Sequence, residues 1–198
     1  MSSDDKPVVV VGSANPDKVK ELNSLLSDFF VVQPRPEEMP ETIEDGETLE
    51  FNALKKAKEV SAFTGQAALA DDTGLFVDAL DGRPGVYSAR YAGENVSYQD
   101  NVKKLLKELS PYPKLEQRKA RFETVIALVQ NGLQPILVSG VVHGHIALQQ
   151  SGVEGFGYDP VFVPEGAEYR SFAQMSKEEK NNYSHRADAI NNLISALN

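Results

Sequence analysis

Residues 7–18 read Pro-Val-Val-Val-Val-Gly-Ser-Ala-Asn-Pro-Asp-Lys, and this stretch indicates the type of fold. Its four valines form a β-branched run, which is typical of a strand that is buried on both faces. Asn15 suits the residue that caps a helix and Pro16 suits its first position, so we predict a helix from Pro16 onward. The chain therefore opens as strand, polar turn and helix, and in open α/β sheets ligands bind at such turns.

Apolar spacing and turn residues predict the later elements. The expected helices span 16–26, 48–64, 97–109 and 184–197. The expected strands span 67–70, 120–130, 135–148 and 161–163, and Asn131-Gly132 predicts a hairpin between the two long ones. Early alternation of strands and helices, followed by a late hairpin, favours a mixed sheet in an α/β protein.

The composition excludes several classes of protein. The 198 residues include 20 Lys and Arg against 29 Asp and Glu, so the formal net charge is −9. Binders of nucleic acids or anionic membranes need clustered basic residues, so we expect neither a nucleic-acid polymer nor a membrane as partner. The chain has no cysteine, which excludes disulfides and a thiolate nucleophile. No apolar run approaches the roughly 18 residues of a membrane span, and Met1 to Lys6 lack a secretory pattern, so we expect a cytoplasmic protein.

Three polar clusters interrupt the apolar pattern, and the first follows the valine run. It reads Ser13-Ala14-Asn15-Pro16-Asp17-Lys18. Free backbone N–H groups at a helix start, together with the Lys18 ammonium, suit a phosphate. A helix cap followed by a surface lysine explains the same residues, and for this cluster alone we prefer that explanation. The glycine patterns of dinucleotide folds and phosphate loops do not match, since only Gly12 is present.

The second cluster, Ala70-Asp71-Asp72-Thr73-Gly74, places two adjacent carboxylates directly after an expected apolar strand. Such a position is unusual, because burying uncompensated charge is costly. Neighbouring extended residues point to opposite sides, so one carboxylate can face a cleft while the other orients backbone or a lysine. Carboxylate oxygens suit Mg²⁺, whereas an Asx-turn that ends the strand is the structural alternative, and both interpretations stay open.

The third cluster joins Gly155-Phe156-Gly157-Tyr158-Asp159-Pro160 to a basic segment containing Lys180, Ser184, His185 and Arg186. Flanking glycines let the backbone approach a flat ligand, and the Phe156 ring can stack on a base. Taken separately, core aromatics and a solvated helix explain these residues better. Taken together, the three clusters contain carboxylates for a metal, lysines for phosphates and groups for a heterocycle. A nucleoside triphosphate with Mg²⁺ needs this set.

At these residues the sequence resembles the inosine triphosphate pyrophosphatase family, from Val8 to about Leu193. The matching blocks are Ser13-x-Asn15-x-x-Lys18-x-x-Glu21, residues 70–75, 84–91 and 155–160, Glu179-Lys180 and Ser184-His185-Arg186. The resemblance implies one α/β domain over 1–198, with an elongated mixed central sheet flanked by helices and a substrate cleft between two lobes. It also implies a homodimer that cleaves ITP, dITP and XTP to the monophosphate and pyrophosphate.

The resemblance further implies roles for individual residues. Asp72 would be the proton acceptor and a Mg²⁺ ligand, and Glu44 would be a second acid of the metal site. The residues implied at the phosphates are Ser13, Ala14, Asn15, Pro16, Asp17, Lys18, Thr73 and Lys180. The residues implied around the base are Phe156, Gly157, Tyr158, Asp159, His185 and Arg186.

Two other functions would explain parts of this pattern. A non-catalytic purine-nucleotide-binding module would keep the site without turnover, but the presence of both Asp72 and Glu44 favours an enzyme. A nicotinamide-dependent dehydrogenase is disfavoured, because the chain lacks the Gly-x-Gly-x-x-Gly pattern. For the enzyme we expect in-line attack of water at the α–β phosphate linkage, with pyrophosphate leaving.

Overall fold

The computed structural model describes residues 6–198. Met1 to Asp5 lie outside the described residues; they belong to the segment in which the sequence shows no secretory pattern. The strands are β1 (Val8–Val11), β2 (Val31–Pro34), β3 (Ala68–Val77), β4 (Pro84–Gly85), β5 (Lys119–Val129), β6 (Ile136–Ile146) and β7 (Phe162–Pro164). The α-helices are α1 (Pro16–Leu26), α2 (Leu49–Thr64), α3 (Tyr98–Glu108), α4 (Lys177–Asn181) and α5 (His185–Leu197). Within residues 6–198, no helix is long and apolar enough to cross a membrane.

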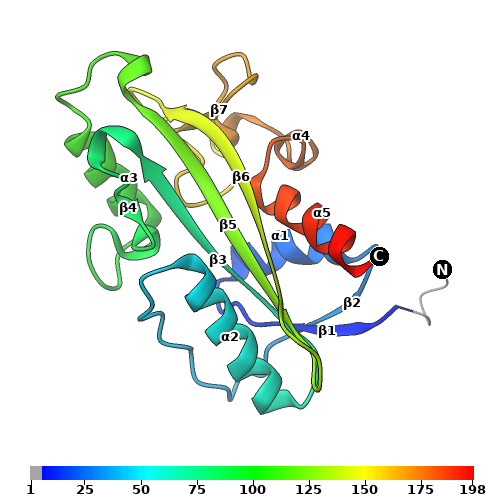
Figure 1. Ribbon diagram of the computed structural model, residues 1–198. Helices are drawn as coiled ribbons and strands as arrows, with labels where there is room; N and C mark the ends of the chain where they lie inside the picture. The colour runs from blue at the N-terminus through cyan, green and yellow to red at the C-terminus, as the bar shows by residue number, and fades with distance from the viewer. Residues whose placement is uncertain (1–5) are drawn as a thin grey trace. The chain divides into compact units, whose positions relative to one another are not determined.

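The strands of the described chain form a seven-stranded sheet in the order β2-β1-β3-β5-β6-β7, and β4 pairs with β3 (Figure 1). β1 runs parallel to both β2 and β3, with Val10 opposite Ala68 in the β1–β3 pair. The β3–β4 and β6–β7 pairs are antiparallel. The sheet is therefore mixed and flanked by helices, which confirms the predicted α/β class.

The chain divides into two units, each described here by itself. The first contains the chain up to Asp72, together with Thr124–Gly140 and Arg186–Asn198. The second contains Thr73–Glu123 and Val141–His185.

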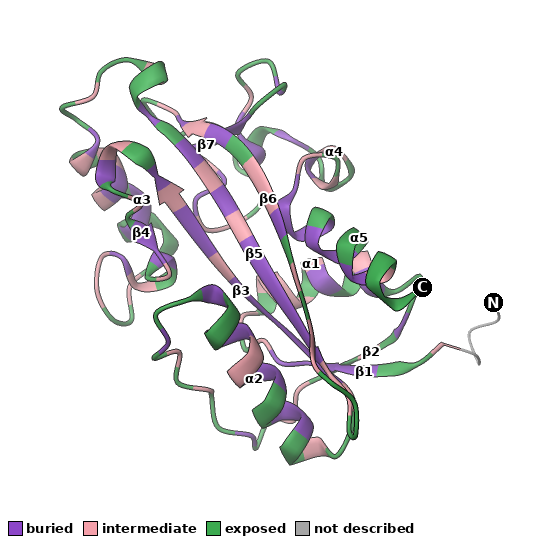
Figure 2. Ribbon diagram, viewed as in Figure 1, coloured by how far each residue is buried: buried purple, intermediate pink, exposed green. Residues whose placement is uncertain are grey.

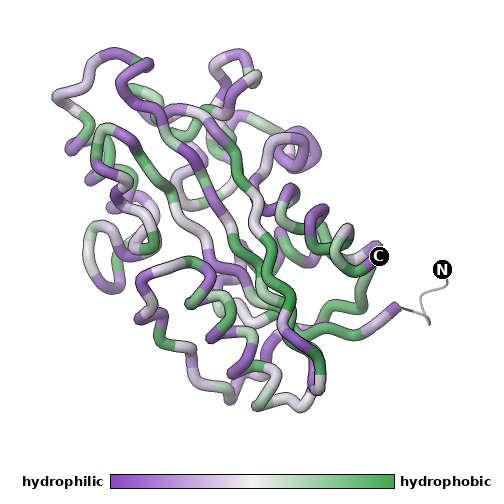
Figure 3. Tube along the Cα trace, viewed as in Figure 1, coloured by the Kyte–Doolittle hydropathy of each residue, from purple (hydrophilic) through white to green (hydrophobic). Residues whose placement is uncertain are grey.

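The core of the first unit explains the four valines of β1. One apolar cluster joins β1, α1, α5 and the hairpin ends of β5 and β6, and it contains Val9, Val11, Leu22, Leu26, Phe30, Leu69, Ile126, Leu128, Ala189, Ile190 and Leu193. Val10 points to the opposite face, where it packs with Met39, Val60 of α2 and Ala68. β1 is thus covered on both faces. Figure 3 shows that β5 and β6 are hydrophobic at the ends that join at their hairpin turn.

The core of the second unit is formed mainly by aromatic and aliphatic side chains around α3. It contains Leu75, Val77, Leu80, Tyr91, Val102, Leu105, Leu109, Ala120, Phe122, Ile146, Tyr158, Val161, Phe162, Ala167, Phe172 and Met175. Figure 2 shows that β3 and β5 are buried along most of their length.

Capping residues fix the helix starts, as the sequence predicts. The Asn15 side chain accepts hydrogen bonds from two backbone N–H groups of the first turn of α1, and Thr48 caps α2. Ser97 and Asp100 form a capping box at the start of α3. Gly65 ends α2 with φ +69°, a left-handed conformation that costs glycine little.

One prediction about this region of the sheet is wrong. The apolar stretch at 67–70 does not end before the two aspartates: β3 runs without a break from Ala68 to Val77, so Asp71 and Asp72 lie inside a strand. Charged partners described below compensate their carboxylates, and this makes the buried position possible. β2 and α4 were not predicted, because β2 has only two valines before Gln33-Pro34 and α4 has no apolar residue, so neither has an apolar pattern.

Candidate active site

Asp71 is the centre of a buried ion-pair network in the first unit. Its Oδ2 accepts hydrogen bonds from Arg186 Nε at 3.3 Å and Nη2 at 3.1 Å, and it lies 3.3 Å from Lys18 Nζ. Arg186 Nη1 also donates to Glu21. Burial alone would raise the pKa of Asp71, but the cations of Lys18 and Arg186 outweigh it and hold the pKa well below its usual range. Asp71 thus remains ionised and fixes the position of Lys18.

Asp72 faces a different set of partners, as alternation along a strand predicts. Lys56 Nζ donates to Asp72 Oδ1 at 3.4 Å and to Glu44 Oε1 at 2.6 Å. Asn52 Nδ2 donates to Asp72 Oδ2 at 3.1 Å. The two acids that the resemblance assigns to a metal therefore converge on one ammonium group.

The acids of this pair have opposite pKa shifts. Burial is the largest influence on Asp72 and raises its pKa above the ordinary value, although Lys56 and Lys18 oppose it. For Glu44, burial also acts upward, but contact with Lys56 outweighs it and the pKa is lowered. At neutral pH Asp72 is thus the more basic carboxylate of the two.

α2 supplies two residues of the site that the sequence analysis did not single out. Asn52 and Lys56 are four positions apart, so they share one helix face, and both are buried. The Asn52 amide also anchors the acidic loop, because its Oδ1 accepts a hydrogen bond from Gly46 N at 2.9 Å. The sequence contains a pattern that could have identified them, because these two polar residues interrupt a helix face that otherwise carries Ala53, Ala57 and Val60.

Two acids of this site fit part of the ligand shell of a magnesium ion. Within residues 6–198, no group of three or more His, Cys, Asp or Glu side chains is arranged to hold a metal by itself. Glu44 and Asp72 nevertheless converge on one cationic centre. Mg²⁺ commonly takes one or two protein carboxylates and completes its shell with water and phosphate oxygens, so two converging acids are sufficient.

The turn before α1 forms the helix cap that the sequence analysis preferred. Asn15 Oδ1 accepts hydrogen bonds from the backbone N–H groups of Asp17 and Lys18 at 3.0 and 3.2 Å. Asn15 N donates in turn to Ser13 Oγ at 3.2 Å. The cap thus uses these two N–H groups, as the preferred interpretation of this cluster predicts, and they are not free for a phosphate. The Lys18 ammonium is the cationic group that this turn contributes.

In the second unit, Asp159 organises the glycine-rich loop 155–159. Its Oδ2 accepts hydrogen bonds from Phe156 N at 2.9 Å and from Lys180 Nζ at 2.7 Å. Lys180 Nζ also lies 5.0 Å from the centroid of the Phe156 ring. Gly155 is required here, since its φ is +74° and a Cβ would lie 2.0 Å from the Asp159 carboxylate. The conformation of this loop thus depends on Gly155 and on the Asp159 carboxylate.

Several other residues predicted at the nucleotide have structural contacts as well. Tyr158 is buried and its hydroxyl donates to Ser88 O at 2.9 Å. His185 is buried and stacks on Phe122, with the ring centroids 4.7 Å apart and the planes at 14°. Gly157 has φ +62°, and Thr73 is half-buried in β3. Arg186 donates from three guanidinium nitrogens to the acids named above.

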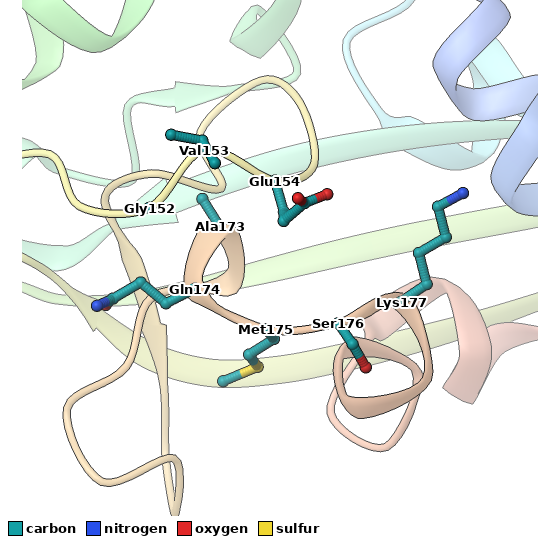
Figure 4. Close-up of a pocket in the computed structure, with 8 residues that line it drawn as sticks. All are labelled: Gly152, Val153, Glu154, Ala173, Gln174, Met175, Ser176 and Lys177. Carbon is teal, nitrogen blue, oxygen red and sulfur yellow. The ribbon is translucent and has the colours of Figure 1, made fainter.

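A cavity of about 570 Å³ opens next to the segment that leads into loop 155–159 (Figure 4). Its lining residues are Gly152, Val153, Glu154, Ala173, Gln174, Met175, Ser176 and Lys177. Backbone hydrogen bonds of 3.0 Å from Val153 N and Glu154 N to Ala173 O join its two sides. None of the residues predicted to contact the nucleotide lines it.

Comparison with known proteins identifies the family. The model of the Ham1 family matches residues 9–196. The chain belongs to the Ham1 family. This Ham1 chain is 41% identical over 189 residues to the dITP/XTP pyrophosphatase of Oceanobacillus iheyensis, a match that covers 93% of this chain and 95% of the relative. It is 45% identical over 188 residues to the protein of the same name from Thermoanaerobacter pseudethanolicus, with 93% of each chain covered.

Solved structures of Ham1 proteins agree with this assignment. The Coxiella burnetii HAM1 protein superimposes with a TM-score of 0.85 at 38% identity, covering 96% of this chain and 98% of that one. The Staphylococcus aureus Ham1 protein gives a TM-score of 0.83 at 38% identity, covering 96% and 97%. The predicted family resemblance and the predicted fold class are both confirmed.

Proposed function

We propose that this Ham1 chain hydrolyses deaminated purine nucleoside triphosphates, namely dITP, ITP and XTP, to the monophosphate and pyrophosphate. The observation that carries the proposal is the group formed in the first unit by the buried Asp72 and Lys56 and the half-buried Glu44. It lies in a chain that is 41% and 45% identical, over 189 and 188 residues, to relatives named dITP/XTP pyrophosphatase.

In this proposal the first unit binds the triphosphate and performs the chemistry. Lys18 and Lys56 neutralise phosphate charge, and Asp72 accepts the proton of the attacking water. Burial raises the pKa of Asp72, which makes it a stronger base than an exposed aspartate. Asn52, through its hydrogen bond to Oδ2, orients the carboxylate. Pyrophosphate leaves with its charge stabilised by the lysines.

We further propose that Asp72 and Glu44 hold Mg²⁺ together with the substrate phosphates. When bound, the ion neutralises phosphate charge and lowers the pKa of a coordinated water. Lys56 keeps the two acids in contact with one centre, so that they are placed for this role in advance. This arrangement also explains how a chain of net charge −9 accepts a polyanion.

The loop 155–159 of the second unit binds the base in this proposal. Phe156 is half-buried, so part of its ring is accessible for stacking on a purine. A donor placed at the 6-oxo group of hypoxanthine or xanthine faces the 6-amino group of adenine instead, and one donor then lacks an acceptor. Such mismatches give discrimination of about 100-fold or more, so ATP is a poor substrate. We also propose a homodimer, which the family resemblance supports, and keep the cytoplasmic location as an expectation from the sequence.

The test is a substrate panel with identified products. Purified protein is incubated with Mg²⁺ and equal concentrations of dITP, ITP, XTP, GTP and ATP, and the products are separated by anion exchange. We expect monophosphate and pyrophosphate, the highest kcat/KM for the three deaminated nucleotides, and loss of turnover with EDTA. Absence of turnover at micromolar enzyme would favour the nucleotide-binding module, and release of orthophosphate would refute cleavage of the α–β linkage. Light scattering after size-exclusion chromatography tests the dimer.

A further inference from the structure

Tyr98, which has no role in the function proposed above, packs against the Phe156 ring. Both residues lie in the second unit. Their ring centroids are 5.9 Å apart and the ring planes meet at 44°. This tilted arrangement is favourable for aromatic pairs, which prefer offset and edge-on contacts. The contact joins α3 to the loop that is proposed to bind the base.

Tyr98 is attached to a well-fixed part of the unit. It is the first residue of α3, directly after Ser97. Asp100 Oδ2 accepts hydrogen bonds from Ser97 N at 3.1 Å and Ser97 Oγ at 2.6 Å, and Asp100 N donates back to Ser97 Oγ at 3.2 Å. Two turns of the same helix bury Val102 and Leu105 in the core. The tyrosine ring thus projects from an anchored helix start.

The orientation of the Phe156 ring, by contrast, depends on contacts from elsewhere in the unit. Asp159 fixes the backbone at Phe156 through the N–H group, a contact that does not itself set the side-chain torsions. Its neighbours Gly155 and Gly157 have φ of +74° and +62° and no side chains to restrain the ring. Two aromatic-ring contacts hold it: the Lys180 ammonium lies 5.0 Å from the ring centroid, and the Tyr98 ring packs against it.

We propose that Tyr98 is a positioning residue for base recognition: it holds the Phe156 ring in the orientation that stacks on the purine. This inference rests on the proposed function, in which Phe156 is the stacking surface. A flat ligand gains from stacking only if the ring is already oriented, because ordering a loose side chain consumes part of the binding free energy. Tyr98 therefore acts on binding of the base and leaves the phosphate chemistry unchanged.

Kinetics of Tyr98→Ala, Tyr98→Leu and Tyr98→Phe test the inference. We expect Tyr98→Ala and Tyr98→Leu to raise KM for dITP about threefold to tenfold, with kcat within about twofold of the parent. Tyr98→Phe keeps the ring and is expected to restore the parent KM. Inorganic tripolyphosphate, which has no base, serves as a competitive inhibitor whose inhibition constant is expected to stay unchanged. Phe63→Ala, which removes another exposed ring from α2, is the matched control and is expected to behave as the parent.

A double-mutant cycle with Phe156→Ala separates this inference from the proposed function. We expect Phe156→Ala to raise KM for dITP, and Tyr98→Ala to add no further increase in that background. If Phe156→Ala leaves KM unchanged, the proposed stacking itself is refuted. If Phe156→Ala raises KM while Tyr98 variants have no effect, or have effects that multiply with it, the role of Tyr98 is overturned. An equal loss of kcat and tripolyphosphate binding in both Tyr98→Ala and Tyr98→Leu would also overturn it, because that pattern indicates a general structural role.

Discussion

Asp71 and Asp72 are adjacent in β3, yet the Asp71 carboxylate lies 3.3 Å from Lys18 Nζ whereas the Asp72 carboxylate lies 3.4 Å from Lys56 Nζ. The two acids therefore serve different parts of the first unit. Asp71 is fully enclosed with Arg186 and holds Lys18, which is proposed to bind phosphate, in place. Asp72 pairs with Lys56 and Asn52 at the proposed reaction centre. Substitutions at these neighbouring positions are expected to have different consequences.

Asp71→Asn is expected to destabilise the protein in a pH-dependent way. Removing one charge from a buried ion-pair network costs about 3 kcal/mol in the free energy of unfolding at neutral pH. The folded pKa of Asp71 is lowered, so its stabilisation is present above the unfolded pKa and is lost as the pH falls. The difference in unfolding free energy between parent and variant should be constant above about pH 5 and shrink below about pH 4. Urea unfolding at several pH values measures it.

Asp45→Asn is the control for this experiment. Asp45 also pairs with a lysine, Lys55 at 2.7 Å, but its side chain is exposed, so little change in stability is expected. A gap between parent and Asp71→Asn that is as large at pH 3 as at pH 7 would show that the stabilisation does not come from the charge of Asp71.

Lys56→Met is expected to shift the pH dependence of catalysis. The Lys56 ammonium lowers the pKa of both Asp72 and Glu44. Without it the pKa of Asp72 rises, so the acid limb of the pH profile of kcat/KM for dITP is expected to move upward by about one pH unit or more. Loss of a phosphate-neutralising cation should lower kcat/KM at neutral pH as well.

Lys55→Met provides the matched control, because Lys55 is the sequence neighbour of Lys56 and pairs with the exposed Asp45. Its pH profile is expected to overlay that of the parent. If Lys56→Met and Lys55→Met give the same acid limb, Lys56 does not control the ionisation of the reaction centre.

The sequence predicted the elements that depend on local patterns. The valine run gave β1, and Asn15, Thr48 and Ser97 marked the starts of the first three helices. Alternation along an extended segment was enough to predict that Asp71 and Asp72 point in different directions. These features depend on residues that are neighbours in the sequence, so they can be predicted from local periodicity and from capping residues.

Contacts between residues that are far apart in the chain could not be predicted from the sequence. Arg186 is 115 positions from Asp71, so no local pattern predicts their ion pair. The helical spacing of Asn52 and Lys56 places them on one face but does not say that the face meets Asp72. Without these partners, two buried aspartates looked incompatible with a strand interior, and the strand was therefore predicted to end at residue 70.

Gly155→Ala is expected to weaken base binding, and its effect should exceed that of backbone strain in a left-handed alanine alone. An alanine there has to adopt φ near +74°, and its Cβ would lie 2.0 Å from the Asp159 carboxylate that holds Phe156 and Lys180. We expect an increase in KM for dITP and a loss of stability beyond the roughly 1–2 kcal/mol of a left-handed alanine. Kinetics and urea unfolding measure the two effects.

The control is Gly132→Ala, which has a similar φ of +79° but no atom within 4 Å of the added Cβ. It isolates the cost of backbone strain and should leave KM unchanged. Equal effects of the two substitutions on stability and KM would mean that the Asp159 contact does not shape the loop.

The most direct test of the proposed chemistry is a comparison of turnover and binding in Asp72→Asn. The asparagine keeps the size of the side chain but is a poor proton acceptor, so kcat for dITP is expected to fall at least about 100-fold. Folding should be retained, and the dissociation constant for dITP, measured by calorimetry, should stay within several-fold of the parent. A kcat within a few-fold of the parent would contradict the account, because the proton acceptor would then lie elsewhere.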